Sequence, residues 1–361
     1  MNGDAYNHAD GSSQAAKRYK SQRSLGHSDP ARQHPDFWYQ DGSVVIEIDL
    51  TRFCLHQSTL QKHSAYFSAL FRGKGKSKSD GRAYHELEGG EPSQNGHIPV
   101  YHVCETTADD FVALLTVIEQ PIKYAEEVPP LSILAGVLRS AGALSFTAQR
   151  KWAERTFERM WPAAFDTLTD EVIPNASTAL TLARTCGVRN VQKRASYELL
   201  RMPTFGQSIA TVLDTVQVGR RGRADATDLE ALPHADLLRL VHAREQLCLA
   251  WAEAAGKAPT DLACPRGTQT QTSTERGSCA SMDVDRMHSR WAELVHTNGL
   301  FAQWMADPLM GLQKLVDIPW KDEGFCKRCV SARRNEWEEL RRKLWNNLDV
   351  WLELPTAADS E

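Results

Sequence analysis

The change of hydrophobic period between residues 44 and 71 constrains the fold of this 361-residue chain more than any other feature. Residues 44–48 form a β-branched run typical of a strand, and residues 52–55 indicate the returning strand of a hairpin. The spacing of large side chains then becomes helical. The residues that set this spacing are Leu55, Leu60, Ser64, Phe67 and Phe71. The sequence therefore predicts a hairpin that leads directly into a helix.

A third strand and a second helix are expected after a polar insert. Residues 72–97 are rich in Gly, Lys, Ser and Asp and predict a long loop. Residues 99–104 alternate in polarity and predict the strand. The helix is expected to follow Thr107 and to end at Pro121, because proline cannot continue a helix. The predicted order is hairpin, helix, strand, helix.

A weak internal repeat follows, and no convincing strand pattern is present from Leu131 onward. Residues 138–160 and 182–202 each have the pattern helix, glycine, second helix. Gly142 and Gly187 are the expected helix stops, because glycine tolerates the left-handed conformation that follows a helix end. Each stretch is predicted to form an αα-hairpin, and the two hairpins to stack.

Two longer helices are expected near the C-terminal end. One spans roughly His234 to Ala255, and a strong final helix runs from about Cys329 to Leu352. Residues 256–281 between them are rich in Gly, Pro, Ser, Thr and Gln and predict a flexible loop. The expected apolar face of the first helix consists of Leu237, Leu238, Val241, Ala243 and Leu247.

A C-x-x-C pair, Cys326 and Cys329, stands at the start of the final helix, where backbone N–H groups stabilise thiolates. Zinc takes four nitrogen or sulfur ligands in tetrahedral geometry, and two more cysteines bracket the flexible loop. The predicted structural zinc site consists of Cys264, Cys279, Cys326 and Cys329, with His288 and His296 as substitute ligands. The alternative is that these thiols are incidental, because a single knuckle is common.

The C-terminal region is also rich in tryptophan. The residues concerned are Trp291, Trp304, Trp320, Trp337, Trp345 and Trp351. Tryptophans at helical spacing are interpreted as core residues, and a ligand or peptide groove is the alternative.

Composition excludes several classes of protein. A hydrophobic fraction of 42% is enough to bury real cores, and a net charge of −4 argues against a dedicated nucleic-acid binder. We find no signal-peptide core and no apolar run long enough to cross a bilayer. We therefore expect an intracellular protein of the cytoplasm or nucleus. The loose basic cluster from Lys17 to Arg23 is the candidate nuclear address.

Catalytic motifs are not evident, so we expect a protein that is not an enzyme. Residues 75–77, Gly-Lys-Ser, are similar to the end of a phosphate-binding loop, but they follow a helix, and Leu70 replaces the required earlier glycine. No nucleophile elbow, His-Glu-x-x-His or dinucleotide fingerprint occurs. Carboxylates are plentiful, but their spacing does not pair them for acid–base work.

The predicted order and one segment together resemble the BTB/POZ family. In the segment, a strand ends at His56, Leu60 follows four residues later, and a Ser-x-x-Phe-x-x-x-Phe helix face runs from Ser64 to Phe71. Residues 36–45, Asp-Phe-Trp-Tyr-Gln-Asp-Gly-Ser-Val-Val, are similar to fungal BTB proteins in particular, as is the Ala183–Val188 stretch. The residues that carry the likeness as interaction or structural positions are Phe53, His56, Leu60, Phe67 and Phe71.

The resemblance implies an interaction domain that forms homodimers or docks protein partners. Gln57 stands where animal dimers commonly have a basic residue, and Asp41 matches the family's acidic partner only approximately. We expect His56 to be structural, its ring bonding backbone groups left unpaired between strand and helix. The leading functional hypothesis is a non-catalytic adaptor. The alternatives are a ubiquitin-ligase substrate adaptor that recruits a cullin scaffold, and a nuclear regulator of transcription or chromatin.

The expected fold is an α+β BTB/POZ core of short strands and helices, followed by a mostly α-helical region. The predicted parts are a disordered tail (1–34), a BTB/POZ-like domain (35–160), a helical extension (161–255), a flexible loop (256–281), a C-terminal helical region (282–354) and a short tail (355–361). More than half of the chain lies beyond the core that gives rise to the likeness.

Overall fold

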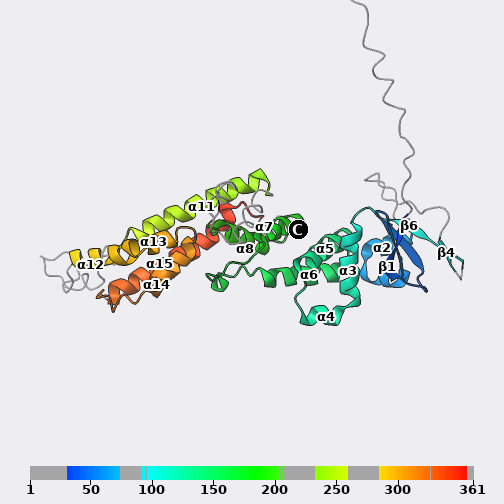
Figure 1. Ribbon diagram of the computed structural model, residues 1–361, viewed down its shortest axis with the longest axis horizontal. Helices are drawn as coiled ribbons and strands as arrows, with labels where there is room; N and C mark the ends of the chain where they lie inside the picture. The colour runs from blue at the N-terminus through cyan, green and yellow to red at the C-terminus, as the bar shows by residue number, and fades with distance from the viewer. Residues whose placement is uncertain are drawn as a thin grey trace, which may run out of the picture. The chain divides into compact units, whose positions relative to one another are not determined.

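The computed structural model describes residues 31–73, 91–93, 96–203, 205, 232–258, 284–325 and 327–355. The chain divides into two units, Met1–Ala108 and Asp109–Glu361. The first contains a mixed sheet with helices, and the second is mostly helical, which confirms the mixed α+β class (Figure 1). The unit boundary lies inside the stretch 35–160 that is predicted as one domain. The basic cluster at Lys17 to Arg23 and residues 75–77 lie outside the described residues.

The sheet of the first unit consists of β1 (Arg32–Trp38), β2 (Val44–Ile48), β3 (Thr51–Leu55) and β6 (Val100–His102). Its order is β1-β3-β2-β6. The predicted hairpin is present, because β2 and β3 pair antiparallel and Asp49 between them takes a positive φ of 52°. β6 lies parallel to β2, and β1 lies parallel to β3. β3 and β2 are the two inner strands of the sheet, and the apolar residues of β2 are buried.

Two parts of the first unit differ from the expectation. β1 begins at Arg32, so residues 32–34, assigned to the disordered tail, belong to a strand. They lack an apolar alternation, and their order comes from pairing with Thr51 and Arg52 on β3. A short hairpin, β4 (Glu91–Ser93) and β5 (Gly96–Ile98), lies within the stretch predicted as loop or at its end.

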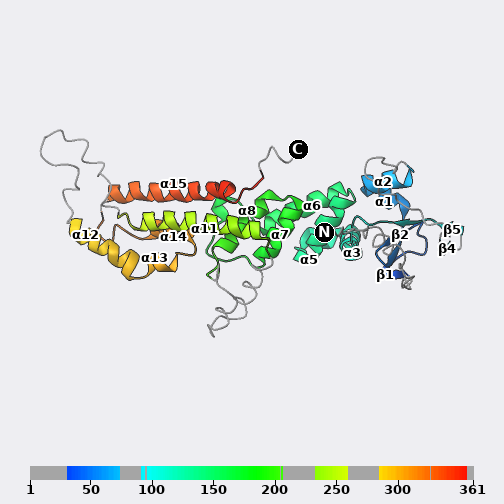
Figure 2. The ribbon, with the colours of Figure 1, turned by 90° about the horizontal axis from the view of Figure 1, so that it is seen from above.

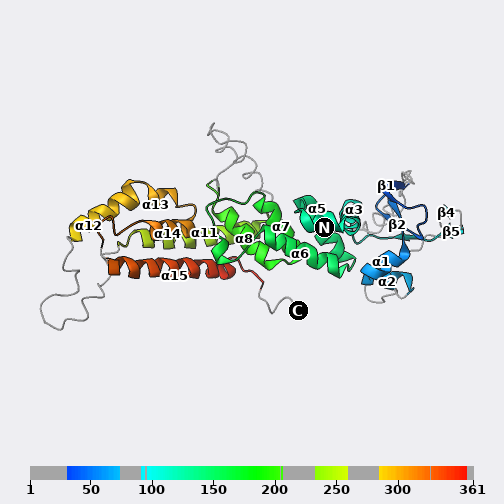
Figure 3. The ribbon, with the colours of Figure 1, turned by 90° about the horizontal axis from the view of Figure 1, so that it is seen from below.

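The helix predicted after the hairpin is two helices, α1 (Gln57–His63) and α2 (Ala65–Phe71). Ser64 between them is buried and extended, and its hydroxyl accepts a 3.0 Å hydrogen bond from the Phe67 amide. A serine in this conformation ends one helix and caps the next. Both helices lie on one side of the strands (Figures 2 and 3).

The predicted αα-hairpins are present in the second unit. Its first helices are α3 (Ala108–Glu119), α4 (Pro121–Glu126), α5 (Leu131–Ala143), α6 (Thr147–Met160), α7 (Ala176–Cys186) and α8 (Arg189–Leu200), with the 3₁₀ turn η1 (Phe165–Thr167) before α7. α5 packs on α6, α7 packs on α8, and α5 also contacts α7. Pro121 follows the end of α3 as expected and begins α4.

The two hairpins turn differently. Gly187 has a φ of 74° and ends α7, as predicted. Gly142 is not the stop of α5, because it lies inside that helix and Ser145 takes the positive φ of 55° instead. A Cβ at Gly142 would lie 2.8 Å from the Arg150 guanidinium, so this glycine makes room for that side chain.

The C-terminal helices pack along one another. They are α11 (His234–Ala255), α12 (Val284–Trp291), the π-helical turn η3 (Ala292–Thr297), α13 (Leu300–Gln303), α14 (Pro308–Asp317) and α15 (Lys327–Trp351). α11, α14 and α15 lie side by side in all three views (Figures 1 to 3). The described residues from Leu131 onward contain no strand, as expected. No helix in the described part of the chain is long and apolar enough to span a membrane.

The apolar face of α11 is narrower than predicted. Ala243 and Leu247 are buried, whereas Leu238 is 57% exposed and Val241 is 47% exposed. Trp251 and Ala255 extend the buried face instead. The helical period fits both sets, so only the neighbours in the fold determine which set is covered.

Candidate interaction surfaces

Most of the residues that carry the family likeness lie in the apolar core of the first unit. Phe53 and Phe67 are completely buried and Leu60 is 2% exposed. Phe71 is half-buried, with its ring 5.7 Å from the Phe67 ring and 5.2 Å from the Tyr101 ring, centroid to centroid. These four side chains fix α1 and α2 against the sheet.

His56 marks the exposed part of the same segment. Its ring stacks on Tyr39 at 5.4 Å, and its Nε2 lies 3.6 Å from the Asp41 carboxylate. The predicted bond from the His56 ring to the backbone is not formed, because Ser43 Oγ accepts the hydrogen bond from the Gln57 amide at 2.9 Å. Tyr39, Asp41, His56 and Gln57, called the His56 patch below, all retain exposed surface.

The predicted zinc ligands lie mostly outside the described residues. Cys264, Cys279 and Cys326 lie outside the described residues. Cys329 is 3% exposed and lies in the first turn of α15. His288 and His296 are both exposed. In the described ranges, no three His, Cys, Asp or Glu side chains form a group that could hold a metal ion.

The tryptophans of the C-terminal region are mainly core residues. Trp291 stacks on Trp320 and on Trp337, and the Trp320 and Trp337 rings are tilted by 43° to one another, with ring centroids 5.2 to 6.0 Å apart. Trp320 Nε1 donates to the Leu315 carbonyl at 2.8 Å, and Trp291 Nε1 donates to the Ala255 carbonyl at 3.0 Å. The indole N–H groups of Trp291 and Trp320 are satisfied inside the protein, which supports the core interpretation for these two positions.

A cluster of buried charges, which the sequence did not indicate, centres on α8. It consists of Arg194, Tyr197, Glu198, Arg201 and Asp307 and is called the α8 ionic cluster below. Arg194 Nε lies 2.9 Å from Glu198 Oε1, and Arg201 Nε lies 3.0 Å from Asp307 Oδ2. The Tyr197 hydroxyl donates to Asp307 Oδ1 at 2.6 Å. Every member is at most 6% exposed, so the cluster is shielded from water.

Burial sets the electrostatics of this cluster. Desolvation raises the pKa of Glu198 and of Asp307, and the neighbouring arginines oppose this shift. The pKa of Tyr197 is raised well above its ordinary value by burial and by the Asp307 charge, so its hydroxyl remains a donor. Arg201 also donates to the Thr169 carbonyl at 2.7 Å. The cluster joins α8 to the segment before α7 and to α14, which is a structural role.

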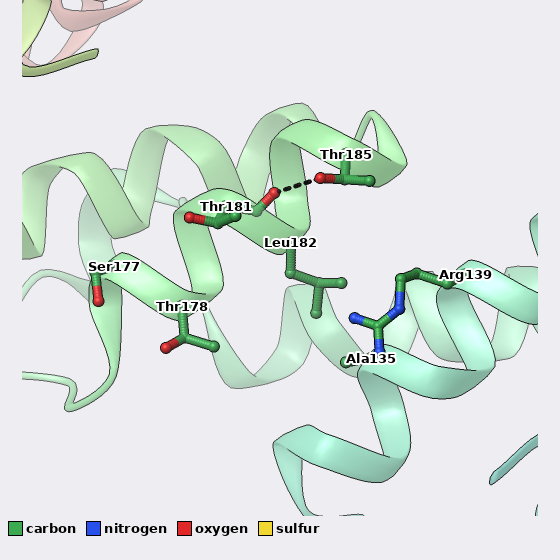
Figure 4. Close-up of a pocket in the computed structure, with 7 residues that line it drawn as sticks. All are labelled: Ala135, Arg139, Ser177, Thr178, Thr181, Leu182 and Thr185. Carbon is green, nitrogen blue, oxygen red and sulfur yellow. Dashed lines mark hydrogen bonds between the residues drawn. The ribbon is translucent and has the colours of Figure 1, made fainter. Parts of the chain in front are cut away.

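A small cavity of about 300 Å³ lies between α5 and α7 (Figure 4). Its lining consists of Ala135, Arg139, Ser177, Thr178, Thr181, Leu182 and Thr185. Arg139 is engaged by Asp110, through bonds of 2.7 Å from Nε and 2.6 Å from Nη2, and this partner raises the pKa of the guanidinium. The Thr185 hydroxyl donates to the Thr181 carbonyl at 2.9 Å. The cavity therefore offers no uncompensated charge to an anion.

No protein-family model matches the chain, and no curated protein matches it. Its function is therefore inferred from its own residues and their geometry.

Proposed function

We propose that the chain is a non-catalytic adaptor that binds other proteins through a BTB/POZ-type domain in its N-terminal part. The observation that supports this is the order of elements: the β2–β3 hairpin, helices α1 and α2, strand β6 beside β2, and then helix α3. The resemblance rests on the same order. β6 joins the sheet in parallel, with Val100 opposite Val45 and Tyr101 opposite Ile46. Such a domain implies self-association or partner docking.

The His56 patch is the surface that we assign to self-association. The family likeness places a charged dimer contact near the first strand of the hairpin and the strand-ending histidine. Here Asp41 is exposed and faces His56, and Gln57 adds a neutral polar group in place of a second charge. Position 57 carries no cation, so Asp41 supplies the negative charge of this patch without a basic neighbour there. A contact built on the patch should therefore respond when the charge of Asp41 is reversed.

Light scattering of the full chain after size-exclusion chromatography tests the proposal. We expect the mass of a dimer, and a shift toward monomer in Asp41→Lys, because the substitution places a positive charge at the contact. Asp36→Lys on β1 is the matched control, since Asp36 is exposed and lies outside the patch. A strict monomer at high concentration would contradict self-association. A dimer that Asp41→Lys leaves intact would show that the dimer contact lies outside the His56 patch.

A cullin-recruiting ubiquitin-ligase adaptor is the second candidate. The observation that favours it is the pair of αα-hairpins, α5–α6 and α7–α8, which follows the sheet unit where such adaptors carry a helical extension. A pulldown with purified cullin scaffold tests it, using chain whose folding is verified by circular dichroism. Folded chain that leaves the scaffold unbound excludes this candidate.

We further propose the zinc site as a staple of the C-terminal region. The buried thiol of Cys329 in the first turn of α15 suits a metal ligand, because thiolates are stabilised there. Metal analysis of chain purified without chelator is expected to give about one zinc per chain. The double variant Cys326→Ser with Cys329→Ser should lose it, whereas Cys104→Ser in the first unit should not. Wild-type chain that contains no zinc would contradict the proposed site.

A further inference from the structure

The second unit has a candidate surface of its own, on the face of α6 that carries Lys151, Trp152 and Arg155. One hollow of about 940 Å³ is lined by Ala148, Lys151, Trp152, Arg155, Thr156, Glu158, Arg159 and Pro162. An adjoining hollow of about 410 Å³ extends to the start of α8, at Val188 to Asn190. Both hollows are lined by Lys151, Arg155 and Glu158, so they form one continuous surface. We call it the α6 groove.

The charge of the α6 groove is opposite to that of the chain. Its lining carries the cations Lys151, Arg155, Arg159 and Arg189 and the carboxylates Glu154 and Glu158. Arg189 is paired with Asp349 of α15, whose Oδ2 lies 3.4 Å from its Nη2, so the cationic character comes from the three residues of α6. The chain as a whole has a net charge of −4. The groove is therefore a local basic site on an acidic protein, which favours an acidic partner over non-specific binding.

The two carboxylates of the groove are already engaged. Glu154 pairs with Arg150 at 2.8 Å, and Glu158 accepts a hydrogen bond from Asn190 Nδ2 at 3.0 Å. Lys151 and Arg155 are exposed, and within the described part of the chain no carboxylate pairs with either of them. These two cations lie four residues apart on one helix, so they occupy the same face. Together with Arg159, which is exposed and donates to the Thr156 hydroxyl at 3.1 Å, they are the charges available to a ligand.

An aromatic side chain stands beside these cations. Trp152 is half-buried and contacts the edge of Tyr124, with ring centroids 6.3 Å apart. Tryptophan and arginine are the residue types that most often carry binding energy at protein interfaces. The exposed part of Trp152 offers an apolar contact between cationic neighbours, a combination that suits a peptide with both acidic and apolar residues.

We propose that the α6 groove binds an acidic peptide segment of a partner protein, with carboxylates on Lys151 and Arg155 and an apolar side chain on Trp152. This rests on the proposed adaptor function and names the chemistry of the partner. A peptide fits better than a single-stranded nucleic acid, because it can place its carboxylates beside the cations and keep them away from Glu154 and Glu158. A polynucleotide carries a negative charge at every residue and meets both glutamates.

Selection from a displayed library of random peptides on the full chain tests the proposal, followed by fluorescence anisotropy of the selected peptides. The selected sequences should have net negative charge and at least one large apolar residue. Removing the two cations, in Lys151→Gln with Arg155→Gln, should weaken their binding about tenfold, and added salt should weaken it further. The matched control is Lys321→Gln with Lys343→Gln, which removes two exposed charges of the same unit outside the groove and should leave binding unchanged.

A second variant separates contact from folding. Trp152→Ala should weaken binding at least about tenfold, and Trp152→Phe should restore part of it, with the helical circular dichroism signal retained in both. Selection that enriches no acidic peptide overturns the proposal, as do peptides that bind the double variant as tightly as the wild type. Displacement of the peptides by an oligothymidylate at lower concentration would assign the groove to nucleic acid instead. If the chain forms its dimer but binds no acidic peptide, the proposal for the α6 groove is wrong and the adaptor proposal is unaffected.

Discussion

The second helices of the two αα-hairpins, α6 and α8, contain the same ion pair in different surroundings. Arg150 Nε lies 2.8 Å from Glu154 Oε1 in α6, and those side chains are 41% and 33% exposed. Arg194 Nε lies 2.9 Å from Glu198 Oε1 in α8, and those side chains are 2% and 0% exposed. Pairing geometry alone therefore does not separate a surface contact from a core contact. The burial of each pair determines what it contributes.

The additional partners of the buried pair explain how α8 is tolerated in the core. All residues from Val191 to Leu200 are buried, although four of the ten are charged or amide-bearing. Arg194 also donates to the Pro162 carbonyl at 3.0 Å, and Glu198 accepts from the Ile173 amide at 3.1 Å. Buried charges are stable only when such bonds complete their pairing. In α6, Arg150 also donates to a backbone carbonyl, that of Cys186 at 3.1 Å, but both side chains of its pair keep about a third or more of their surface exposed. The polar face of α6 therefore remains in contact with water and is available for binding.

The largest expected effect comes from removing the buried carboxylate. Glu198→Ala leaves Arg194 buried without its ion-pair partner and removes the 3.5 Å contact to Arg201. The free energy of unfolding should fall by about 3–5 kcal/mol, because an uncompensated buried charge remains. Denaturant unfolding followed by circular dichroism measures this loss.

Glu154→Ala is the matched control, because it breaks the exposed pair of the same residue types. It should cost about 0.3–0.5 kcal/mol, as is usual for a solvent-exposed pair four residues apart on a helix. Equal losses for the two variants would show that burial does not distinguish the pairs, and the comparison would then fail.

The turns of the hairpins allow a medium-sized test. Gly187→Ala should reduce the free energy of unfolding by about 1–2 kcal/mol, because alanine is strained at a φ of 74°. A new methyl group there meets no atom within 4 Å, so conformation and not collision is responsible. The converse change, Ser145→Gly at a φ of 55°, removes such strain and should stabilise the fold slightly. If Gly187→Ala had no effect, the left-handed turn would not be needed to end α7.

Local sequence signals predict where helices and strands occur better than they predict where these elements end and what they pair with. The β-branched residues Val44 and Val45 predict a strand, and the structure confirms it. Ser64 and Gly142 were misassigned, because the same residue types serve inside helices and at their ends. The sequence does not predict β1 as a strand and assigns its residues 32–34 to the tail, because the order of β1 comes from pairing with the backbone of β3 and not from its own side chains.

The candidate sites depend even more on long-range contacts. The buried polar side chains of α8 have partners from distant segments, such as Asp307 for the Tyr197 hydroxyl, and no periodicity in the sequence pairs them. The i,i+4 spacing of Arg194 and Glu198 was a usable signal, but Arg150 and Glu154 have the same spacing on the surface. The sequence also does not show that Lys151 and Arg155 of the α6 groove lack carboxylate partners, because this depends on the contacts that Glu154 and Glu158 make in the fold. The zinc prediction involves residues outside the described ranges and stays a prediction.

The smallest expected effect concerns the lysines of the two helices, Lys193 in α8 and Lys151 in α6. Lys193 is 8% exposed, with its Nζ 3.2 Å from Asp349 and 4.6 Å from the centre of the Trp345 ring. Burial lowers its pKa below the ordinary value of 10.5, against the opposing effect of Asp349. Between the lowered pKa and 10.5, the unfolded chain binds more protons than the folded chain. The free energy of unfolding contributed by Lys193 therefore rises with pH through this window.

Lys193→Met removes this dependence, so the wild type should gain stability relative to the variant as the pH rises from neutral toward 10.5. Denaturant unfolding of both proteins across this pH range measures the difference between their free energies of unfolding. Groups that both proteins share contribute equally to the two values, so their titration cancels in the difference. Lys151→Met in α6 is the control for replacing a lysine by methionine at an exposed position of a helix. A Lys193→Met difference independent of pH would show that the folded protein does not disfavour the charged lysine. Burial would then not govern that position of α8.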